Sequence, residues 1–464
     1  MSFKTSVFRC ASSTWVKQSL SHVKHPNYGL FSTSAVHNEK DYAFEMACSS
    51  VRYGEGCTQE VGLDCKNFGA KHVCVMTDKK LAGMSPVQVV LESLDRHNVP
   101  YKLYDRVRCE PSDQSFKEAI DYAKEGNFDV YLAVGGGSVI DTCKAANLYA
   151  SNPSAELLDY VNAPIGKGLP ITHTLKPLIA VTTTAGTGSE TTGTAVFDFL
   201  EMRAKTGISN RALRPTLGIV DPLHLRTMPE RVAAYSGIDV LCHALESFTA
   251  MPFSERMPRP ENPNMRPAYQ GSNPVSDIWS KHALRMTAKY LKRAVYQPED
   301  WTARRGMHFA ASYAGIGFGN AGTHLCHGMC YPISGLNRKY FSRDYNDDHP
   351  LIPHGLSVVI TAPAVFMFTS KACPERHLEA AECLGVDVRN VRKEDAGMVL
   401  SETVRKIMDD IEVPNGLKDL GYSTEDIPDL VKGTLPQHRV TKLCPRPFDG
   451  DDIAELLEKS MRVY

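Results

Sequence analysis

The sequence predicts an α/β fold in two parts: a mostly parallel β-sheet with helices on its faces, followed by an all-helical part. In the first half of the 464 residues, short runs rich in β-branched residues alternate with amphipathic stretches. After Pro222 the strand signal disappears, and long segments with a 3.6-residue apolar period replace it. We therefore expect an α/β domain at residues 41–222 and a helical domain at 223–464, preceded by a segment of different composition at 1–40.

The first part is expected to contribute five strands. They are short apolar runs, namely Val73–Thr77, Tyr101–Tyr104, Val130–Val134, Leu178–Thr182 and Leu217–Val220. Amphipathic stretches such as SPVQVVLESLDRHN and SFKEAIDYAKEGN lie between them. Because a helical connection allows successive strands to run in the same direction, this alternation predicts a parallel sheet covered by helices.

The second part is expected to consist of long helices. Apolar periodicity marks the segments Pro229–Thr249, Ser276–Tyr296, Trp301–Gly315 and Glu375–Leu384. A proline-rich insert, Met251–Pro274, interrupts them, and its many prolines prevent regular structure. We interpret the insert as a solvated loop, with a lid over a cleft as the alternative.

The first forty residues differ in composition from the rest of the chain. No acidic residue occurs before Glu39, and four basic residues stand among many serines and threonines: Lys4, Arg9, Lys17 and Lys24. A positive, hydroxyl-rich and acid-free segment is typical of a mitochondrial transit peptide, and a plain disordered tail is the alternative. We expect a protein of the mitochondrial matrix whose mature chain starts between about Ser32 and Asp41.

Charge and cysteine content argue against several classes of partner. The formal net charge of −1 and the pI near 7.0 give no electrostatic reason for binding nucleic acid or an anionic membrane. No apolar run approaches the roughly 20 residues that cross a bilayer. Thirteen cysteines without a CxxC pair indicate reduced thiols in an intracellular protein. We expect small-molecule partners, no nucleic acid and no membrane.

Two glycine-rich turns follow predicted strands. GGGSVID (residues 135–141) opens a helix, and about fifty residues later TTAGTGSE (183–190) follows the next apolar strand. Free N–H groups and the dipole at a helix start bind a pyrophosphate, and glycines let the ligand approach. Small hydroxyl residues there can hydrogen-bond phosphate or ribose. The alternative for each is a tight turn without a ligand, since neither is a GxGxxG or Walker loop.

Asp78 stands at the carboxyl end of the strand in KHVCVMTDKKL. An acidic residue at this place in a parallel sheet is suited to the ribose hydroxyls of adenosine, and its charge would repel a 2′-phosphate. This position favours NAD over NADP. Capping of the segment after the strand is the alternative.

Four residues of the second part have the chemistry of a metal-ligand set. Asp239 and His243 stand four apart on a predicted helix and so share one face, His327 lies in GTHLCHGM, and His354 lies in IPHG. Three neutral imidazoles and one carboxylate suit Fe²⁺ or Zn²⁺ and leave a coordination position open for a substrate oxygen. The alternative for the Asp239–His243 pair is an ordinary helix-stabilising contact.

Taken together, these motifs resemble the iron-containing (group III) alcohol dehydrogenase family. Asp78, GGGSVID, TTAGTGSE, the Asp-Pro of GIVDP, GIDVLCHALE, GFGNAGTHLCHGM and IPHG occur in the order and spacing of that family, from about Tyr42 to the C-terminus. The resemblance implies a dehydroquinate synthase-like fold with NAD and a divalent metal. It implies metal ligands at Asp239, His243, His327 and His354, and nucleotide contacts at Asp78, Gly136, Gly137, Ser138, Asp141, Thr183, Thr184 and Ser189.

One position departs from the family pattern. Many members have a second histidine four residues after the third ligand, and this chain has Tyr331 there. A tyrosine can relay a proton but binds metal less readily than histidine does. The acid–base candidates are therefore Tyr331, His324 and the ribose hydroxyls, although His324 could equally be an ordinary helix residue.

Several stretches resemble one branch of the family, among them DYAFEMA, DTCKAANLYASNP and VKGTLPQHRVTKL. This resemblance implies a transhydrogenase that keeps NAD tightly bound and moves a hydride from 4-hydroxybutyrate to 2-oxoglutarate, giving succinic semialdehyde and 2-hydroxyglutarate. Substrate carboxylates call for a basic residue, for which the candidates are Arg338, Lys339, Arg343, Lys442 and Arg446. We also expect a homo-oligomer.

Three other functions stay open. The nearest is a conventional NAD-dependent alcohol or 4-hydroxybutyrate dehydrogenase with the same site. The second is a lyase related to dehydroquinate synthase, against which the Asp-x-x-x-His spacing argues. The third is a non-catalytic regulator that binds NAD and metal.

Overall fold

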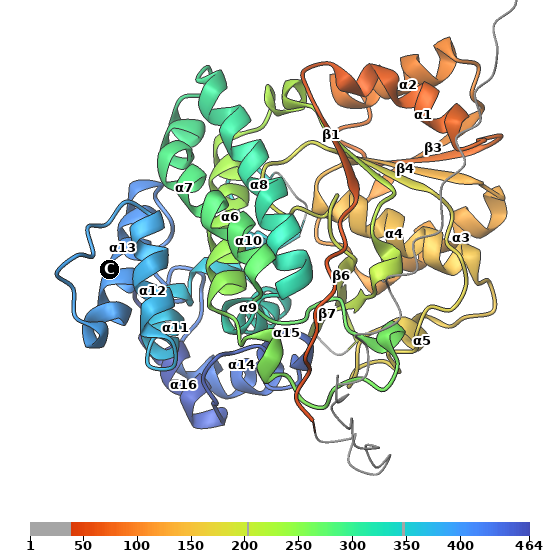
Figure 1. Ribbon diagram of the computed structural model, residues 1–464. Helices are drawn as coiled ribbons and strands as arrows, with labels where there is room; N and C mark the ends of the chain where they lie inside the picture. Colours follow the sequence, from red (N-terminus) through yellow and green to blue (C-terminus); the bar gives the residue numbers. More distant parts are fainter. Residues whose placement is uncertain (1–38, 202–203, 346–348) are drawn as a thin grey trace, which may run out of the picture.

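The computed structural model describes residues 39–201, 204–345 and 349–464, and Figure 1 shows a sheet with its helices beside a separate group of helices. The predicted transit peptide falls on residues 1–40, so almost all of it lies outside the described residues. The expected fold class, a parallel-sheet α/β part followed by a helical part, is confirmed.

The sheet of the first part has six strands in the order β1-β8-β5-β4-β2-β3, and every neighbouring pair is parallel. The bounds are β1 Ser50–Tyr53, β2 Val73–Asp78, β3 Tyr101–Val107, β4 Val130–Gly135, β5 Leu178–Thr182 and β8 Leu217–Val220. All five predicted strands are present. Only β1 was not predicted in this sheet, and it lies at an edge.

Helices cover both faces of this sheet (Figure 1). On one face, Val73 and Val75 of β2 pack with residues of α1 (Val61–Asn67) and α2 (Ser85–Arg96). On the other face, Cys74 and Met76 pack with residues of α3 (Asp113–Gly126) and α4 (Gly137–Ser151). Because successive side chains of a strand point to opposite faces, a strand covered on both sides is apolar throughout, as β2 is.

A separate antiparallel hairpin, β6 (Thr194–Phe199) and β7 (Ala204–Ser209), was not predicted. Its apolar face, with Ala195, Phe197 and Ile208, packs with residues of α3 and α4, near the short helix α5 (Leu157–Tyr160). Because β6 follows the second glycine-rich turn directly, the hairpin ties that turn to α4.

Beyond β8, the described residues form only helices, turns and isolated bridges. The four predicted helices are present as α6 (Glu230–Thr249), α7 (Pro274–Tyr296), α8 (Trp301–Ala321) and α12 (Pro374–Cys383). The others are α9 (Leu325–Gly335), α10 (His354–Val359), α11 (Ala362–Thr369), α13 (Ala396–Asp410), α14 (Ile427–Thr434), α15 (His438–Thr441) and α16 (Gly450–Lys459). Helix α6 is buried on nearly every side, so its polar residues can face an internal site.

The proline-rich insert forms the expected loop, with two short 3-10 turns at Phe253–Glu255 and Pro263–Met265. It is anchored to the segment that precedes β1. The Arg266 guanidinium lies 2.9 Å from Asp41, and the amide of Gln270 bonds the backbone of Glu45. Among the residues that can be described, no helix has both the length and the apolar character needed to cross a bilayer.

Candidate metal and nucleotide site

A cavity of about 990 Å³ lies between the sheet and the helical part. Its lining includes the last residue of β2 and the residues that directly follow β4 and β5 on one side, and residues of α6, α9 and α10 on the other. The carboxyl edge of a parallel sheet is the usual ligand-binding edge, and the volume is at the upper end of the roughly 300–1,000 Å³ of small-molecule sites. All twelve predicted cofactor- and metal-binding residues belong to this lining: Asp78, Gly136, Gly137, Ser138, Asp141, Thr183, Thr184, Ser189, Asp239, His243, His327 and His354.

The two glycine-rich turns lie against each other at this edge. A Cβ atom at Gly136 would lie 3.0 Å from Cγ2 of Thr184, and one at Gly137 would lie 2.7 Å from Cγ2 of Thr187. Only glycine therefore lets the turns approach so closely. Gly136 is also the N-cap of α4, and no side chain caps this helix. The N-terminus of α4 thus remains suited to an anion.

A hydrogen bond between Ser189 and Asp141 links the two turns. The Ser189 hydroxyl donates to Oδ1 of Asp141 at 2.6 Å and accepts from Nζ of Lys144 at 2.6 Å, and the backbone N–H of Val196 donates to Oδ2 of Asp141 at 2.9 Å. Burial lowers the pKa of Lys144 to about 8, while the Asp141 carboxylate favours its charged form. Lys144 could not be predicted from the sequence because a lysine in a helix is ordinarily a surface residue.

Asp78 lies at the rim of the cavity, at the end of β2. Its Oδ1 accepts hydrogen bonds from the backbone N–H groups of Lys80 (2.8 Å) and Leu81 (2.9 Å). The carboxylate therefore caps the turn after the strand, the alternative raised from the sequence. The same contacts fix its negative charge at the cavity edge.

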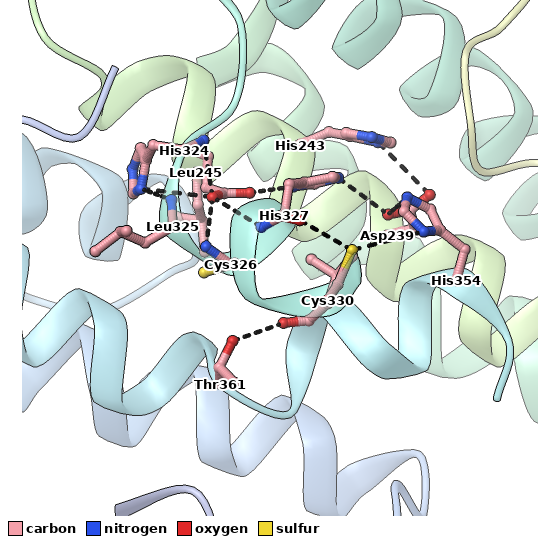
Figure 2. Close-up of polar contacts among 12 residues, drawn as sticks. Asp239, His243, Leu245, His324, Leu325, Cys326, His327, Cys330, His354 and Thr361 are labelled. Atoms are coloured by element: carbon pink, nitrogen blue, oxygen red, sulfur yellow. Dashed lines mark hydrogen bonds and ion pairs between the residues drawn. The ribbon is translucent and has the colours of Figure 1, made fainter. Parts of the chain in front are cut away.

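The four proposed metal ligands converge on one point, as Figure 2 shows. One ligand atom from each lies within 4.8 Å of all the others. Asp239 and His243 stand one turn apart on α6, His327 belongs to α9, and His354 begins α10. Oxygens of Asp239 lie 3.8 Å from Nδ1 of His243, 3.7 Å from Nε2 of His327 and 4.0 Å from Nε2 of His354. Tetrahedral ligands at roughly 2.1 Å from an ion stand about 3.4 Å apart, so these separations suit a shared cation.

Three potential ligand atoms of the cluster are buried without a hydrogen-bond partner among the described residues. Oδ1 of Asp239, Nδ1 of His243 and Nε2 of His327 are buried and have no hydrogen-bond partner in the described part of the chain. Burial raises the pKa of Asp239 to about 7 and lowers the pKa of His354 to about 3. Unpartnered buried polar atoms are costly, and neutral imidazoles offer free lone pairs. The residues present therefore fit a divalent cation.

Glu246 supports the cluster from the next turn of α6. Its Oε1 accepts from the backbone N–H groups of His324 (2.9 Å) and Cys326 (2.8 Å), at the start of α9, and its Oε2 accepts from Nδ1 of His327. The last contact turns Nε2 of His327 toward Asp239. Glu246 was not predicted from the sequence, although its spacing of three from His243 and seven from Asp239 places it on the same helix face.

His324 does not reach the cavity. Its Nδ1 accepts from the backbone N–H of Leu325 at 2.8 Å, and its Nε2 lies 3.0 Å from the hydroxyl of Thr249. Figure 2 shows the ring on the far side of His327 from Asp239 and His354. Burial lowers the pKa of His324 to about 4. The geometry therefore favours an ordinary structural role over the expected acid–base role, because both ring nitrogens are used within the helical part.

Tyr331 does line the cavity, one helical turn after His327. Nη2 of Arg439 donates a hydrogen bond to its hydroxyl, and burial raises the pKa of Tyr331 well above the usual value of a phenol. The side chain is therefore a neutral phenol at physiological pH.

The five basic residues suggested for substrate carboxylates lie elsewhere. None of Arg338, Lys339, Arg343, Lys442 and Arg446 is part of the cavity lining that the structure describes. Arg343 pairs with Glu230 at 3.0 Å, and the Arg446 guanidinium packs 3.8 Å from the ring centroid of Phe368. The cavity lining contains other basic residues, among them Arg439.

Family models match most of the chain. The model described as iron-containing alcohol dehydrogenase matches residues 48–222, and the C-terminal model of the Fe-containing alcohol dehydrogenase family matches residues 268–461. The chain belongs to the iron-containing alcohol dehydrogenase family. It is therefore an oxidoreductase, and the resemblance inferred from its motifs is confirmed.

Individual relatives agree with this assignment. The chain is 63% identical over 424 residues to a Xenopus tropicalis protein named hydroxyacid-oxoacid transhydrogenase, mitochondrial, covering 91% of this chain and 92% of that protein. It is 62% identical over 424 residues to the Homo sapiens protein of the same name, covering 91% of each. Among solved structures, 1,3-propanediol oxidoreductase has a TM-score of 0.78 and 26% identity, covering 90% of this chain and 100% of that chain.

Proposed function

We propose that the protein is a hydroxyacid-oxoacid transhydrogenase of the mitochondrial matrix. It oxidises 4-hydroxybutyrate to succinic semialdehyde and reduces 2-oxoglutarate to 2-hydroxyglutarate, so that the hydride and proton lost by one substrate are gained by the other. The names of relatives with 62% and 63% identity support the reaction. The observation that carries the chemistry is the cluster of unpartnered buried ligand atoms, which shares one cavity with the uncapped start of α4.

Asp239, His243, His327 and His354 would hold a divalent ion, Fe²⁺ or Zn²⁺. When bound, that ion supplies a Lewis acid that polarises a substrate oxygen. Both ions accept this set of donors, and the oxygen and nitrogen ligands do not favour one of them strongly. Glu246 would keep the ring of His327 in its binding orientation.

NAD would lie along the carboxyl edge of the sheet. When bound, it supplies the carrier of the hydride, and in this proposal it stays bound between the two half-reactions. The N–H groups at Gly137 and Ser138 would receive the pyrophosphate, Thr183 and Thr184 would offer hydroxyl groups, and the Asp78 carboxylate would disfavour a 2′-phosphate. Asp141 and Ser189 would act through the turns that they brace.

Tyr331 would serve the proton movement at the substrate end. Because its oxygen accepts from Arg439, its own hydrogen stays available for donation into the cavity. His324 has no comparable access, so we assign it to the support of α9.

The organisation of the chain is also part of the proposal. Residues 1–40 would be a transit peptide, 41–222 the nucleotide-binding domain and 223–464 the metal-binding domain. The relatives named as mitochondrial support the first assignment. A homo-oligomer is supported by β1, because this edge strand exposes Ser50 and Val51 and an open edge invites pairing.

The reaction can be tested without any added nucleotide. Dialysed protein is incubated with 4-hydroxybutyrate and 2-oxoglutarate, and both products are quantified. The proposal expects succinic semialdehyde and 2-hydroxyglutarate in equal amounts, and neither product from the Asp239→Asn variant. Turnover that appears only with added NAD⁺, and rises with its concentration, would favour the conventional dehydrogenase instead.

A further inference from the structure

Arg439 lies on a different side of the cavity from the other lysine and arginine side chains of its lining. The lysine and arginine side chains in the described lining are Lys79, Lys80, Arg106, Arg108 and Arg439. The first four belong to the carboxyl ends of β2 and β3 and to the loops that follow them. Arg439 belongs to α15, so it is the cation on the helical side of this lining, where the Asp and His cluster lies.

Two tyrosines fix the guanidinium of Arg439. Its Nη2 donates to the hydroxyl of Tyr331, and its Cζ lies 5.7 Å from the ring centroid of Tyr331 and 5.2 Å from that of Tyr269. Both distances are within the range of cation–π attraction. Tyr331 is four residues after His327 on α9, so the guanidinium is held one helical turn from a proposed metal ligand.

No negative charge compensates Arg439 in the part of the chain that the structure describes. Burial raises the pKa of Tyr331, so its phenol stays neutral, and Tyr269 contacts the guanidinium through its ring face and a side-chain hydrogen bond. Two acidic residues of the cavity lining have other cations as partners: Glu110 lies 2.5 Å from Lys205, and Asp141 lies 3.6 Å from Lys144. A half-buried guanidinium without a carboxylate is costly, and an anionic ligand removes that cost.

We propose that Arg439 binds the substrate carboxylate that stands two methylene groups from the reacting carbon, with Tyr331 and Tyr269 holding the guanidinium in place. This inference rests on the proposed function. In 4-hydroxybutyrate the hydroxyl-bearing carbon and the carboxylate are separated by two methylene groups, and in 2-oxoglutarate the keto carbon and the distal carboxylate have the same separation. One fixed guanidinium can therefore position donor and acceptor in turn, through the two parallel hydrogen bonds of an arginine–carboxylate pair.

The departure of Tyr331 from the family pattern agrees with this role. A phenol accepts the hydrogen bond of Arg439 and remains neutral, whereas a histidine could gain a proton and repel the guanidinium. Tyr331 is thus a positioning residue for Arg439 as well as a candidate proton donor.

The test compares a charged with an uncharged substrate in one half-reaction. Reduction of protein-bound NAD is followed in a single turnover with 4-hydroxybutyrate or with 1-butanol. Arg439→Gln is expected to raise the half-saturating concentration of 4-hydroxybutyrate about 10- to 100-fold, the range for losing hydrogen bonds to a charged group, and to change that of 1-butanol by less than about threefold. Lys442→Gln, an exposed neighbour outside the cavity lining, is the matched control and should change neither.

Further variants keep the test decisive if Arg439→Gln does not fold. Arg439→Lys keeps the charge but not the planar fork, and Tyr331→Phe removes the hydroxyl that orients it. In each variant the half-saturating concentration of 4-hydroxybutyrate should rise more than that of 1-butanol, with metal content unchanged. If the half-saturating concentration rose equally for both substrates, or did not rise for 4-hydroxybutyrate, the role of Arg439 would be overturned while the proposed function stayed intact. An unaltered protein that oxidises neither substrate would overturn the proposed function and this inference together.

Discussion

Glu246 accepts a hydrogen bond from Nδ1 of His327, and this contact leaves Nε2 of His327 facing Asp239 at 3.7 Å. The same carboxylate holds the N-terminus of α9 through the backbone N–H groups of His324 and Cys326. One buried acidic residue of α6 therefore sets both the position of α9 and the orientation of its metal-binding ring. The arrangement is typical of metal sites, where the outer partner of a histidine fixes its tautomer.

Glu246→Gln is expected to weaken metal binding about 10- to 100-fold. Glutamine has a single oxygen, so it cannot accept from both the backbone of α9 and Nδ1 of His327. Metal content after dialysis against a graded series of chelator concentrations measures the effect. Glu379→Gln, which removes a half-exposed partner of Lys281, is the control and should bind metal like the unaltered protein. Equal metal retention by both variants would show that Glu246 does not orient His327.

Metal affinity should fall about tenfold for each pH unit below about pH 7 and level off above it. Burial raises the pKa of Asp239 to about 7 in the metal-free protein, so a bound proton must leave when the ion enters at lower pH. Burial lowers the pKa of His354 to about 3, so this imidazole contributes no slope between pH 5 and pH 7. Competition with a chelator across that range gives the slope. A flat profile in the unaltered protein would contradict the expectation, and the Asp239→Asn variant should lack this slope.

Asp239→Asn is expected to stabilise the metal-free protein at pH 8 and to destabilise it relative to the unaltered protein once metal is added. The folded-state pKa of about 7 lies above that of the unfolded chain, so the stability linked to this proton is present below about pH 4 and is lost as the pH rises through 7. At pH 8 the ionised Asp239 carboxylate lowers the free energy of unfolding by an amount on the order of 4 kcal/mol, and asparagine removes this loss. Melting temperatures with chelator and with excess Zn²⁺ check both signs. A variant that melts lower under both conditions would argue against a cation at this carboxylate.

Gly137→Ala should reduce bound NAD at least tenfold, because a Cβ at this position would lie 2.7 Å from Cγ2 of Thr187 and would force the two turns apart. Gly83→Ala is a matched control, since a Cβ there meets nothing within 4 Å. The nucleotide released by denaturing each purified variant is quantified per mole of protein. Normal NAD content in Gly137→Ala would mean that the turns do not form the phosphate site.

Strands buried on both faces could be predicted from the sequence, while the edge strand and the hairpin could not. The run from Val73 to Met76 is apolar throughout because helices cover both of its faces. By contrast, β1 is short, polar and exposed at the sheet edge, so its sequence resembles a loop. In β6, Ala195 and Phe197 alternate with less buried neighbours, a signal that the adjacent glycine-rich turn obscured.

The metal ligands could be predicted because few other combinations of residue types and spacing suit one ion. Their supporting residues could not. Glu246 resembles a surface residue of a helix, and only the packing of α9 against α6 buries it. Arg439 lies in a four-residue helix, where periodicity cannot indicate an inward face. His324 was expected at the site because it stands three residues from His327, but the start of α9 directs its ring toward Thr249.

Transfer of deuterium between the two substrates shows whether the hydride passes through a nucleotide that stays bound to the protein. The protein is given 4-hydroxybutyrate with deuterium on its hydroxyl-bearing carbon, unlabelled 2-oxoglutarate and an excess of unlabelled NADH in solution. We predict that 2-hydroxyglutarate carries the deuterium on its hydroxyl-bearing carbon, without dilution by the free nucleotide. Dilution in proportion to the added NADH, or the absence of labelled 2-hydroxyglutarate, would contradict a transhydrogenase that keeps its nucleotide bound.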